Sequence, residues 1–176
     1  LRDTLEGLTM ARNFAPSRYL LILIAFTGFF CFPSIVLMPA MAKSVLGGNS
    51  QTLGFLLMGV AVGALAGSFV MASLKSYDRL SWWCTRACLG FGISVILFSL
   101  SGNIYVGIAL AAPVGFSMVT STISCNTLLQ SMVPASARSR IMALYTLAIL
   151  GIPPFGSLLA GKLGDSFGTD WALFIC

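Results

Sequence analysis

The chain has 176 residues, of which 57% are hydrophobic and only 9% are charged, and its mean hydropathy is +0.95. Soluble domains carry about 25% charged residues because a water-exposed surface needs them, so this composition excludes a soluble protein and predicts an all-α polytopic transmembrane helix bundle. The net charge of +5 does not indicate nucleic-acid binding, because the basic residues stand in short clusters between long apolar runs, as in membrane loops.

The first segment, residues 1–16, is predicted to be an interfacial amphipathic helix followed by a linker. Leu1, Leu5 and Leu8 recur at near-helical spacing, with charged residues between them. The segment is too polar to cross a bilayer and is expected to lie along its surface. Pro16 then interrupts the helix.

Residues 17–176 are predicted to form a transmembrane helical half-bundle, because a bilayer core needs about 20 apolar residues as helix. The apolar runs predict spans at about 19–42, 52–74, 80–100, 104–133 and 141–161, with the start of a truncated sixth at 171–176. Pro33 and Pro39 are expected to kink the first span. A start without Met and an end inside an apolar run lead us to expect a piece of a longer protein.

Basic residues are divided unequally between the two sides of the predicted bundle. Eight fall on the side of the N-terminus, namely Arg2, Arg12, Arg18, Lys75, Arg79, Arg86, Arg138 and Arg140. The other side has two, Lys43 and Lys162. Since cytoplasmic loops carry the excess of Lys and Arg, this distribution predicts a cytoplasmic N-terminus.

Two spans carry small residues or prolines that predict close helix contacts. In the second span Gly59, Gly63 and Gly67 repeat every four residues, which favours close packing within the chain, with homodimerisation as the alternative. In the fifth span the corresponding residues are Pro153, Pro154, Gly156 and Gly161. They indicate either a packed kink or a hinge that lets the helix rock.

The predicted span cores contain no acidic residue, which argues against a proton relay within this segment. The acids Asp3, Glu6, Asp78, Asp165 and Asp170 are all assigned to loops or to the interfacial helix. The chain also has no His and no phosphate-binding loop, so we expect neither an enzyme nor a cofactor. The five cysteines lie in or beside apolar runs without a CxxC motif, and are interpreted as small buried hydrophobes rather than metal ligands or disulfides.

Uncharged polar residues are concentrated in the fourth span. Thr122, Asn126 and Gln130 repeat at i, i+4 and i+8 and therefore share one helix face, with Ser121 beside it. Amide side chains are costly against lipid, so this face is expected to look at protein or at a water-filled cavity. The alternatives are interhelical hydrogen bonds and a cavity wall that touches substrate, for which Asn126 is the best candidate.

Four segments resemble the major facilitator superfamily, and within it the bacterial exporters that include the enterobactin exporter. They are residues 37–48 (LMPAMAKSVLGG), 126–130 (NTLLQ), 138–145 (RSRIMALY) and 156–168 (GSLLAGKLGDSFG). The resemblance implies the C-terminal six-helix half of a transporter that works by alternating access against an N-terminal half. It also implies a multi-pass protein of the bacterial inner membrane.

The resemblance also suggests charged residues that act as latches, although the family's loop motif is only partly kept. Asp78 and Arg79 match it between the second and third spans, while Asp165 matches a similar motif on the opposite side without the basic residue. Arg138 and Arg140 flank a helix start, where they either anchor the chain to anionic lipid or contact the other half in gating.

The function expected from these observations is secondary-active export of an amphipathic small molecule, such as a siderophore, a drug or a metabolite. The alternatives are a lysophospholipid flippase-like facilitator and a membrane scaffold that uses the same fold without transport. The expected partners are the substrate, the lipid bilayer and the N-terminal half, with no nucleic acid.

Overall fold

The structure is a computed structural model that describes residues 15–30, 33–44, 47–74 and 77–168. The described helices are α2 (Ala15–Phe30), α3 (Pro33–Ser44), α4 (Ser50–Ser73), α5 (Tyr77–Ser99), α6 (Ile104–Met132), α7 (Ala135–Gly151) and α8 (Pro153–Phe167). The predicted interfacial helix before residue 15 and the truncated span at 171–176 lie outside these residues.

Five helical segments of the described chain are long and apolar enough to cross a membrane. They are Ser17–Lys43, Ser50–Ser73, Arg79–Ser99, Ile104–Met132 and Ala135–Ser166. No strand occurs among the residues that the structure describes. The predicted fold class, an all-α polytopic transmembrane bundle, is therefore confirmed.

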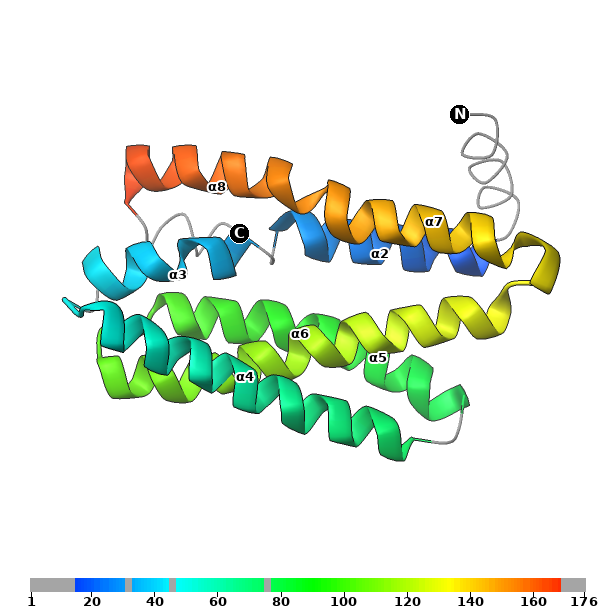
Figure 1. Cartoon of the computed structure of the whole chain (residues 1–176), viewed down its shortest axis with the longest axis horizontal. Helices are drawn as coiled ribbons and strands as arrows, with labels where there is room; N and C mark the ends of the chain where they lie inside the picture. The colour runs from blue at the N-terminus through cyan, green and yellow to red at the C-terminus, as the bar shows by residue number, and fades with distance from the viewer. Residues whose placement is uncertain (1–14, 31–32, 45–46, 75–76, 169–176) are drawn as a thin grey trace.

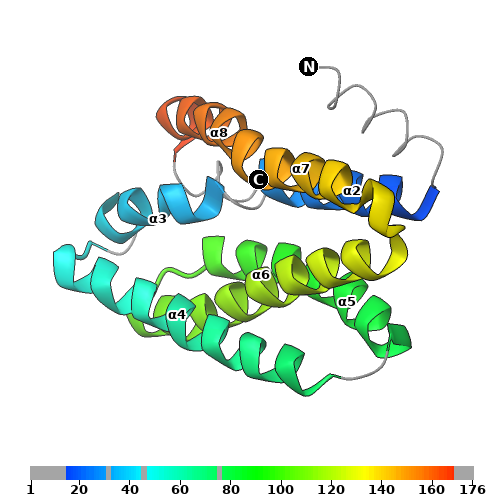
Figure 2. The same cartoon turned by 45° about the vertical axis from the view of Figure 1, so that its right-hand side comes forward.

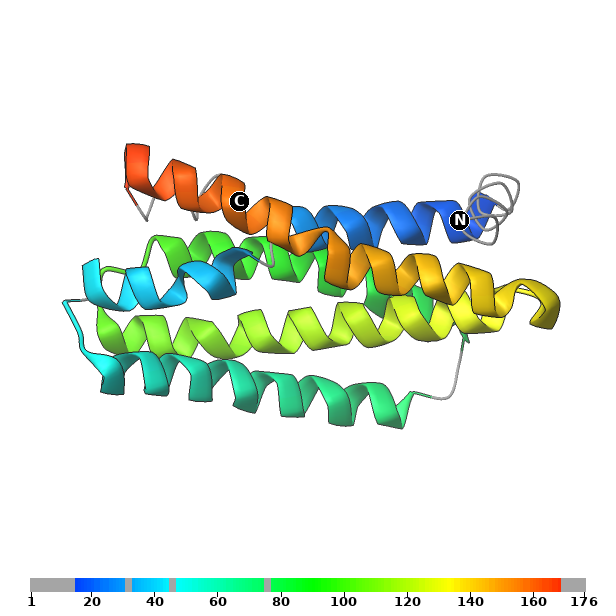
Figure 3. The same ribbon diagram turned by 45° about the horizontal axis from the view of Figure 1, so that its top comes forward.

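The helices form two packed groups (Figure 1). In the first, α6 lies between α4 and α5 and packs along both of them; in the second, α2 packs on α7 and α8, and α3 packs on α8. The two groups meet where α6 contacts α2 and α7 and where α3 contacts α4, and the turned views in Figures 2 and 3 show the same arrangement. α6 is therefore the central helix of the bundle.

Two helices begin at asparagine caps in the turns that precede them. The Asn49 side chain accepts hydrogen bonds from the backbone N–H groups of Gln51 (3.0 Å) and Thr52 (3.3 Å), and the Thr52 hydroxyl accepts one from the Asn49 backbone. This reciprocal capping box satisfies donors that the start of α4 leaves open. Asn103 caps α6 in the same way through the backbone N–H of Tyr105 (2.9 Å).

The predicted fifth span differs from the structure in its length. Helix starts at Ala135 rather than near 141, and after the break between Gly151 and Pro153 it continues to Phe167 instead of ending at 161. The prediction that Asp165 lies in a loop is therefore wrong. The apolar run ends before the helix ends, because an exposed last turn accepts polar residues as long as the backbone hydrogen bonds continue.

The third span also starts earlier in the structure than the sequence predicts. α5 begins at Tyr77, so Asp78 and Arg79 stand in its first turn rather than in the preceding loop. In the first span the described part of α2 ends at Phe30 and that of α3 begins at Pro33, and residues 31–32 lie outside the described chain. Proline is tolerated in a first turn because its missing N–H has no intrahelical partner there.

Candidate substrate cavity and helix seams

The polar face of α6 begins between the two helix groups and becomes exposed toward the end of the helix. Thr122 and Asn126 are half-buried and Gln130 is exposed. The Gln130 amide donates a hydrogen bond to the Asn126 side-chain oxygen, one turn away on the same helix, and the Thr122 hydroxyl donates to the Met118 carbonyl (2.8 Å). These two bonds lie within α6, and the Asn126 side chain also lies beside the Tyr145 hydroxyl of α7.

Ser121 and Thr122 lie together in one small cavity. The cavity has a volume of about 130 Å³ and is lined by Ile24, Thr27, Gly28, Phe91, Met118, Ser121, Thr122 and Ile149, from α2, α5, α6 and α7. It is mostly apolar and too small for an amphipathic drug-sized molecule, since such ligands occupy about 300–1,000 Å³. Asn126 and Gln130 do not line it; they continue the polar face toward the end of α6.

One hydrogen bond ties this region of α6 to α7. The Tyr145 hydroxyl donates to the Thr122 backbone carbonyl at 3.0 Å. This carbonyl oxygen already accepts a backbone hydrogen bond within α6, so the Tyr145 hydroxyl uses its second lone pair. The contact holds α7 against the polar face at the place where the two helix groups meet.

The three glycines of α4 lie against the backbone of α6. A Cβ placed on Gly59 would stand 2.8 Å from the Ile108 carbonyl oxygen, and one on Gly67 would stand 2.9 Å from the Phe116 carbonyl oxygen. At Gly63 an added Cβ would overlap the Ala112 carbonyl. The two backbones therefore approach closely, as small-residue registers allow.

The partner register on α6 is a feature that sequence reasoning missed. Gly107, Ala111 and Gly115 repeat every four residues and are all buried, and a Cβ on Gly115 would overlap the Val60 carbonyl. The signal is present in the sequence as a second small-xxx-small pattern, on the same helix as the hydroxyls and amides. α4 and α6 thus carry complementary small-residue faces.

The break between α7 and α8 lies against α2. A Cβ on Gly28 would contact the Pro153 ring at 3.5 Å, and one on Gly156 would overlap the Phe29 carbonyl. Pro153 is buried, whereas Pro154 is exposed. A Cβ on Gly161 would meet nothing within 4 Å, so this glycine makes no close helix contact in the described chain.

The predicted latch residues are not gathered at one place. Arg79 lies in the first turn of α5, and Arg138 and Arg140 lie in the first two turns of α7, at the same end of the bundle. Asp165 stands in the last turn of α8 at the opposite end (Figure 1). Arg79, Arg138 and Asp165 are exposed. The side chain of Asp78 lies outside the described part of the structure.

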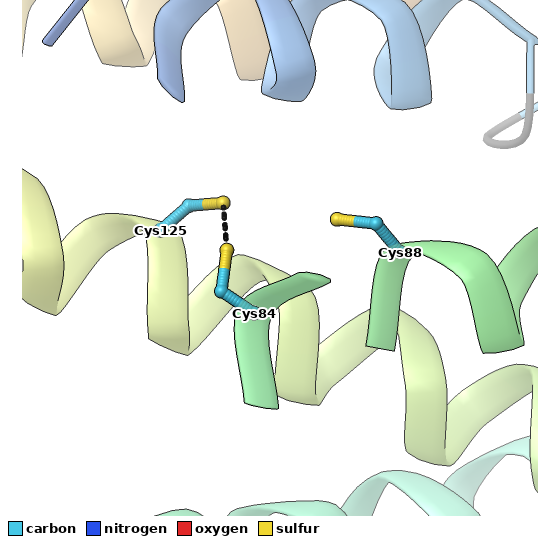
Figure 4. Close-up of side chains that lie close together, drawn as sticks. All are labelled: Cys84, Cys88 and Cys125. Atoms are coloured by element: carbon cyan, nitrogen blue, oxygen red, sulfur yellow. Dashed lines mark hydrogen bonds between the residues drawn. The ribbon is translucent and has the colours of Figure 1, made fainter. Parts of the chain in front are cut away.

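A group of three cysteines is the chemical feature that the sequence analysis did not foresee. Cys84 and Cys88 of α5 and Cys125 of α6 point toward one another (Figure 4), and their three sulfurs lie within 4.8 Å of one another. The i, i+4 spacing of the first two is visible in the sequence. The third comes from another helix, so only the packing of α5 on α6 could reveal it.

Comparison with known proteins places the chain in a family. Residues 3–176 match the family described as transmembrane secretion effector, a branch of the major facilitator superfamily. Over 116 residues the chain is 26% identical to the multidrug efflux pump Tap of Mycolicibacterium fortuitum. The aligned region covers 66% of this chain but only 28% of the pump. No solved structure matches the chain.

The family match extends over nearly the whole sequence, and the five membrane-spanning helices agree with it. The chain is a multi-pass membrane protein that belongs to the transmembrane secretion effector family of the major facilitator superfamily.

Proposed function

We propose that the protein containing this chain is a secondary-active exporter of an amphipathic small molecule and works by alternating access. The chain would form its C-terminal half, and an N-terminal six-helix half would complete the transport path. Family membership and the likeness to a multidrug efflux pump support this proposal. The finer likeness to the enterobactin-exporter branch, carried by residues 37–48 and 126–145, is part of the same proposal.

The observation that carries the proposal is the polar face of α6. Asn126 and Gln130 bear amides within a span of a bundle that exposes many large apolar side chains, such as Phe69, which is 72% exposed. An amide facing lipid is costly, whereas one facing a water-filled path can bind substrate. Gln130 is exposed when this half is considered without the other. Gln130 and Asn126 would therefore line the wall that the two halves share.

The helix seams have a separate role in the proposed mechanism. The close α4–α6 contact would make these helices move as one rigid unit, because neither backbone can shift without colliding with the other. The break at Pro153 separates α7 from α8 at the place where both pack against α2, and this break would serve as the hinge. Arg79, Arg138 and Arg140 at one end, and Asp78 beside them in the chain, would contact lipid headgroups or the other half.

Replacement of Asn126 by Leu tests the cavity wall. In proteoliposomes with the full-length protein, the loss of one hydrogen bond to substrate is expected to cost about 1 kcal/mol, which is about a fivefold rise in KM. Thr127→Val is the matched control, because Thr127 is the next residue on α6 and points about 100° away around the helix. Equal KM values for Asn126→Leu and the unaltered protein, over several amphipathic substrates, would remove Asn126 from the wall.

The proposed orientation places the start of α5 and the start of α7 in the cytoplasm. Single cysteines at Gly102 and Ser136, both exposed, test it in a background whose native cysteines are replaced by serine. A membrane-impermeant maleimide on intact cells is expected to label Gly102→Cys, and to label Ser136→Cys only after the membrane is opened. The reverse labelling pattern would invert the topology.

A flippase-like facilitator is the second candidate, because an uncharged apolar wall also suits a lipid. It predicts that lysophospholipid is moved across proteoliposome membranes without an imposed ion gradient. A scaffold predicts no movement of either substrate class. The exporter predicts gradient-dependent movement of amphipathic compounds, so the same preparation separates the three.

A further inference from the structure

The three cysteines form a compact sulfur cluster between α5 and α6, which we call the thiol cluster (Cys84, Cys88 and Cys125). The Cys84 and Cys125 sulfurs are 3.1 Å apart, and all three lie within 4.8 Å of one another. Cys84 is 2% exposed, Cys125 is fully buried and Cys88 is half-buried. Two sulfurs come from successive turns of one helix and the third from its neighbour (Figure 4).

This spacing is close to what one shared ion requires. A metal–thiolate bond is about 2.3 Å long, so two sulfurs on one ion lie about 3.3–4 Å apart for bond angles of about 90–120°. The thiol cluster already lies in or near this range and needs only small side-chain rotations. Three sulfurs from two helices therefore meet at one place in the apolar core.

The surroundings of the thiol cluster decide which ion fits. Cys84 and Cys125 belong to an apolar cluster with Ile24, Leu128 and Leu129, where a net charge is costly. Arg86, the nearest cation along α5, lies on the opposite helix face, is exposed, and stacks over the Trp82 ring at 3.7 Å. Three thiolates around a monovalent or divalent ion leave an uncompensated negative charge, whereas a trivalent centre gives a neutral complex.

We propose that the thiol cluster is a binding site for a trivalent, thiol-seeking metalloid of the arsenite class. Arsenite enters as neutral As(OH)₃. Three As–O bonds break and three As–S bonds form; each thiol proton leaves with one hydroxide as water, and arsenic stays trivalent. No oxidant, external base or counter-ion is needed, so the exchange suits a site of low polarity.

The thiol cluster lies near the end of the bundle at which α5 begins. Cys84 is five residues from Arg79 at the start of the span, a depth of about 7.5 Å along the helix. Cys88 lies one turn further along α5 and is half-buried, whereas Cys84 and Cys125 are buried. The cavity lined by Phe91, Ser121 and Thr122 lies one turn deeper on the same two helices.

The test uses the full-length protein in lipid nanodiscs, kept anaerobic with a phosphine reductant, and arsenite alone as the probe. Arsenic retained after gel filtration gives the stoichiometry, and X-ray absorption at the arsenic edge counts its sulfur neighbours. We expect one arsenic per chain with three sulfur neighbours. Binding should also raise the unfolding temperature, since a ligand held by the folded state stabilises it.

Single Cys84→Ser, Cys88→Ser and Cys125→Ser variants are each expected to weaken arsenite binding at least tenfold. Thr85→Ala, which changes the exposed residue next to Cys84 on α5 without removing a thiol, should bind as the unaltered protein does. If a serine variant fails to fold, the alanine variant replaces it, and the sulfur count on the unaltered protein decides in either case.

Three results would overturn the proposal. They are arsenic with fewer than three sulfur neighbours, equal binding by a folded thiol-cluster variant, and Zn²⁺ or Cu⁺ bound at the three sulfurs so tightly that arsenite does not displace it. Because every readout is of binding, failure of the site is distinguishable from failure of the proposed transport function.

Discussion

A Gly63→Ala substitution is expected to lower the stability of the protein by more than the 1–3 kcal/mol typical of overpacked cores. The added Cβ would overlap the Ala112 carbonyl, which belongs to the backbone of α6 and has no rotamer into which it can move. α4 would therefore have to move away from α6, and contacts along the whole seam from Gly59 to Gly67 would loosen. The unfolding midpoint of the purified full-length protein measures the effect.

Gly54→Ala is the matched control for this prediction. Gly54 stands on the same helix, but an added Cβ there would meet nothing within 4 Å. Alanine is the better helix former by about 1 kcal/mol in water, so the control is expected to be neutral or slightly stabilising. Equal midpoints for the two variants would mean that α4 and α6 do not pack through Gly63.

A Gly156→Ala substitution is expected to have the second large effect, at the contact between α8 and α2. Its Cβ would overlap the Phe29 carbonyl and stand 3.0 Å from the Pro33 ring. Both groups are rigid, so α8 would be displaced beside the break at Pro153. We expect a lower unfolding midpoint and, because the proposed hinge would be disturbed, transport reduced at least tenfold.

Gly161→Ala provides the comparison, since Gly161 lies on the same helix with open space around it. It should keep both the midpoint and the transport rate. A Gly156→Ala protein with unaltered stability but lost transport would indicate that Gly156 is needed for motion rather than for packing. Unaltered stability together with unaltered transport would contradict the close α8–α2 contact.

The membrane fold could be predicted because it follows from composition and from the lengths of the apolar runs. Segment ends were less predictable, since hydropathy marks where the bilayer core ends and not where helical bonding ends. Asp165 illustrates this difference: it is polar and exposed, and yet it stands inside α8. For the same reason α5 begins at Tyr77, before the apolar run that was predicted to start at residue 80.

The candidate site could be predicted only where a pattern lies within one helix. Spacing alone predicts that one face of α6 carries Thr122, Asn126 and Gln130. The same reasoning places Gly59 and Gly63 on one face of α4. The thiol cluster could not be found in this way, because 41 residues separate Cys84 from Cys125. Only the packing of two helices brings these thiols together.

The proposed export of amphipathic molecules is tested most directly by efflux from proteoliposomes that contain the full-length protein. With a fluorescent amphipathic dye on the side corresponding to the cytoplasm, an imposed proton or sodium gradient is expected to drive dye across the membrane. Dissipation of the gradient should stop the movement. If correctly folded protein moves no dye or lysophospholipid under any imposed gradient, the transporter function is contradicted.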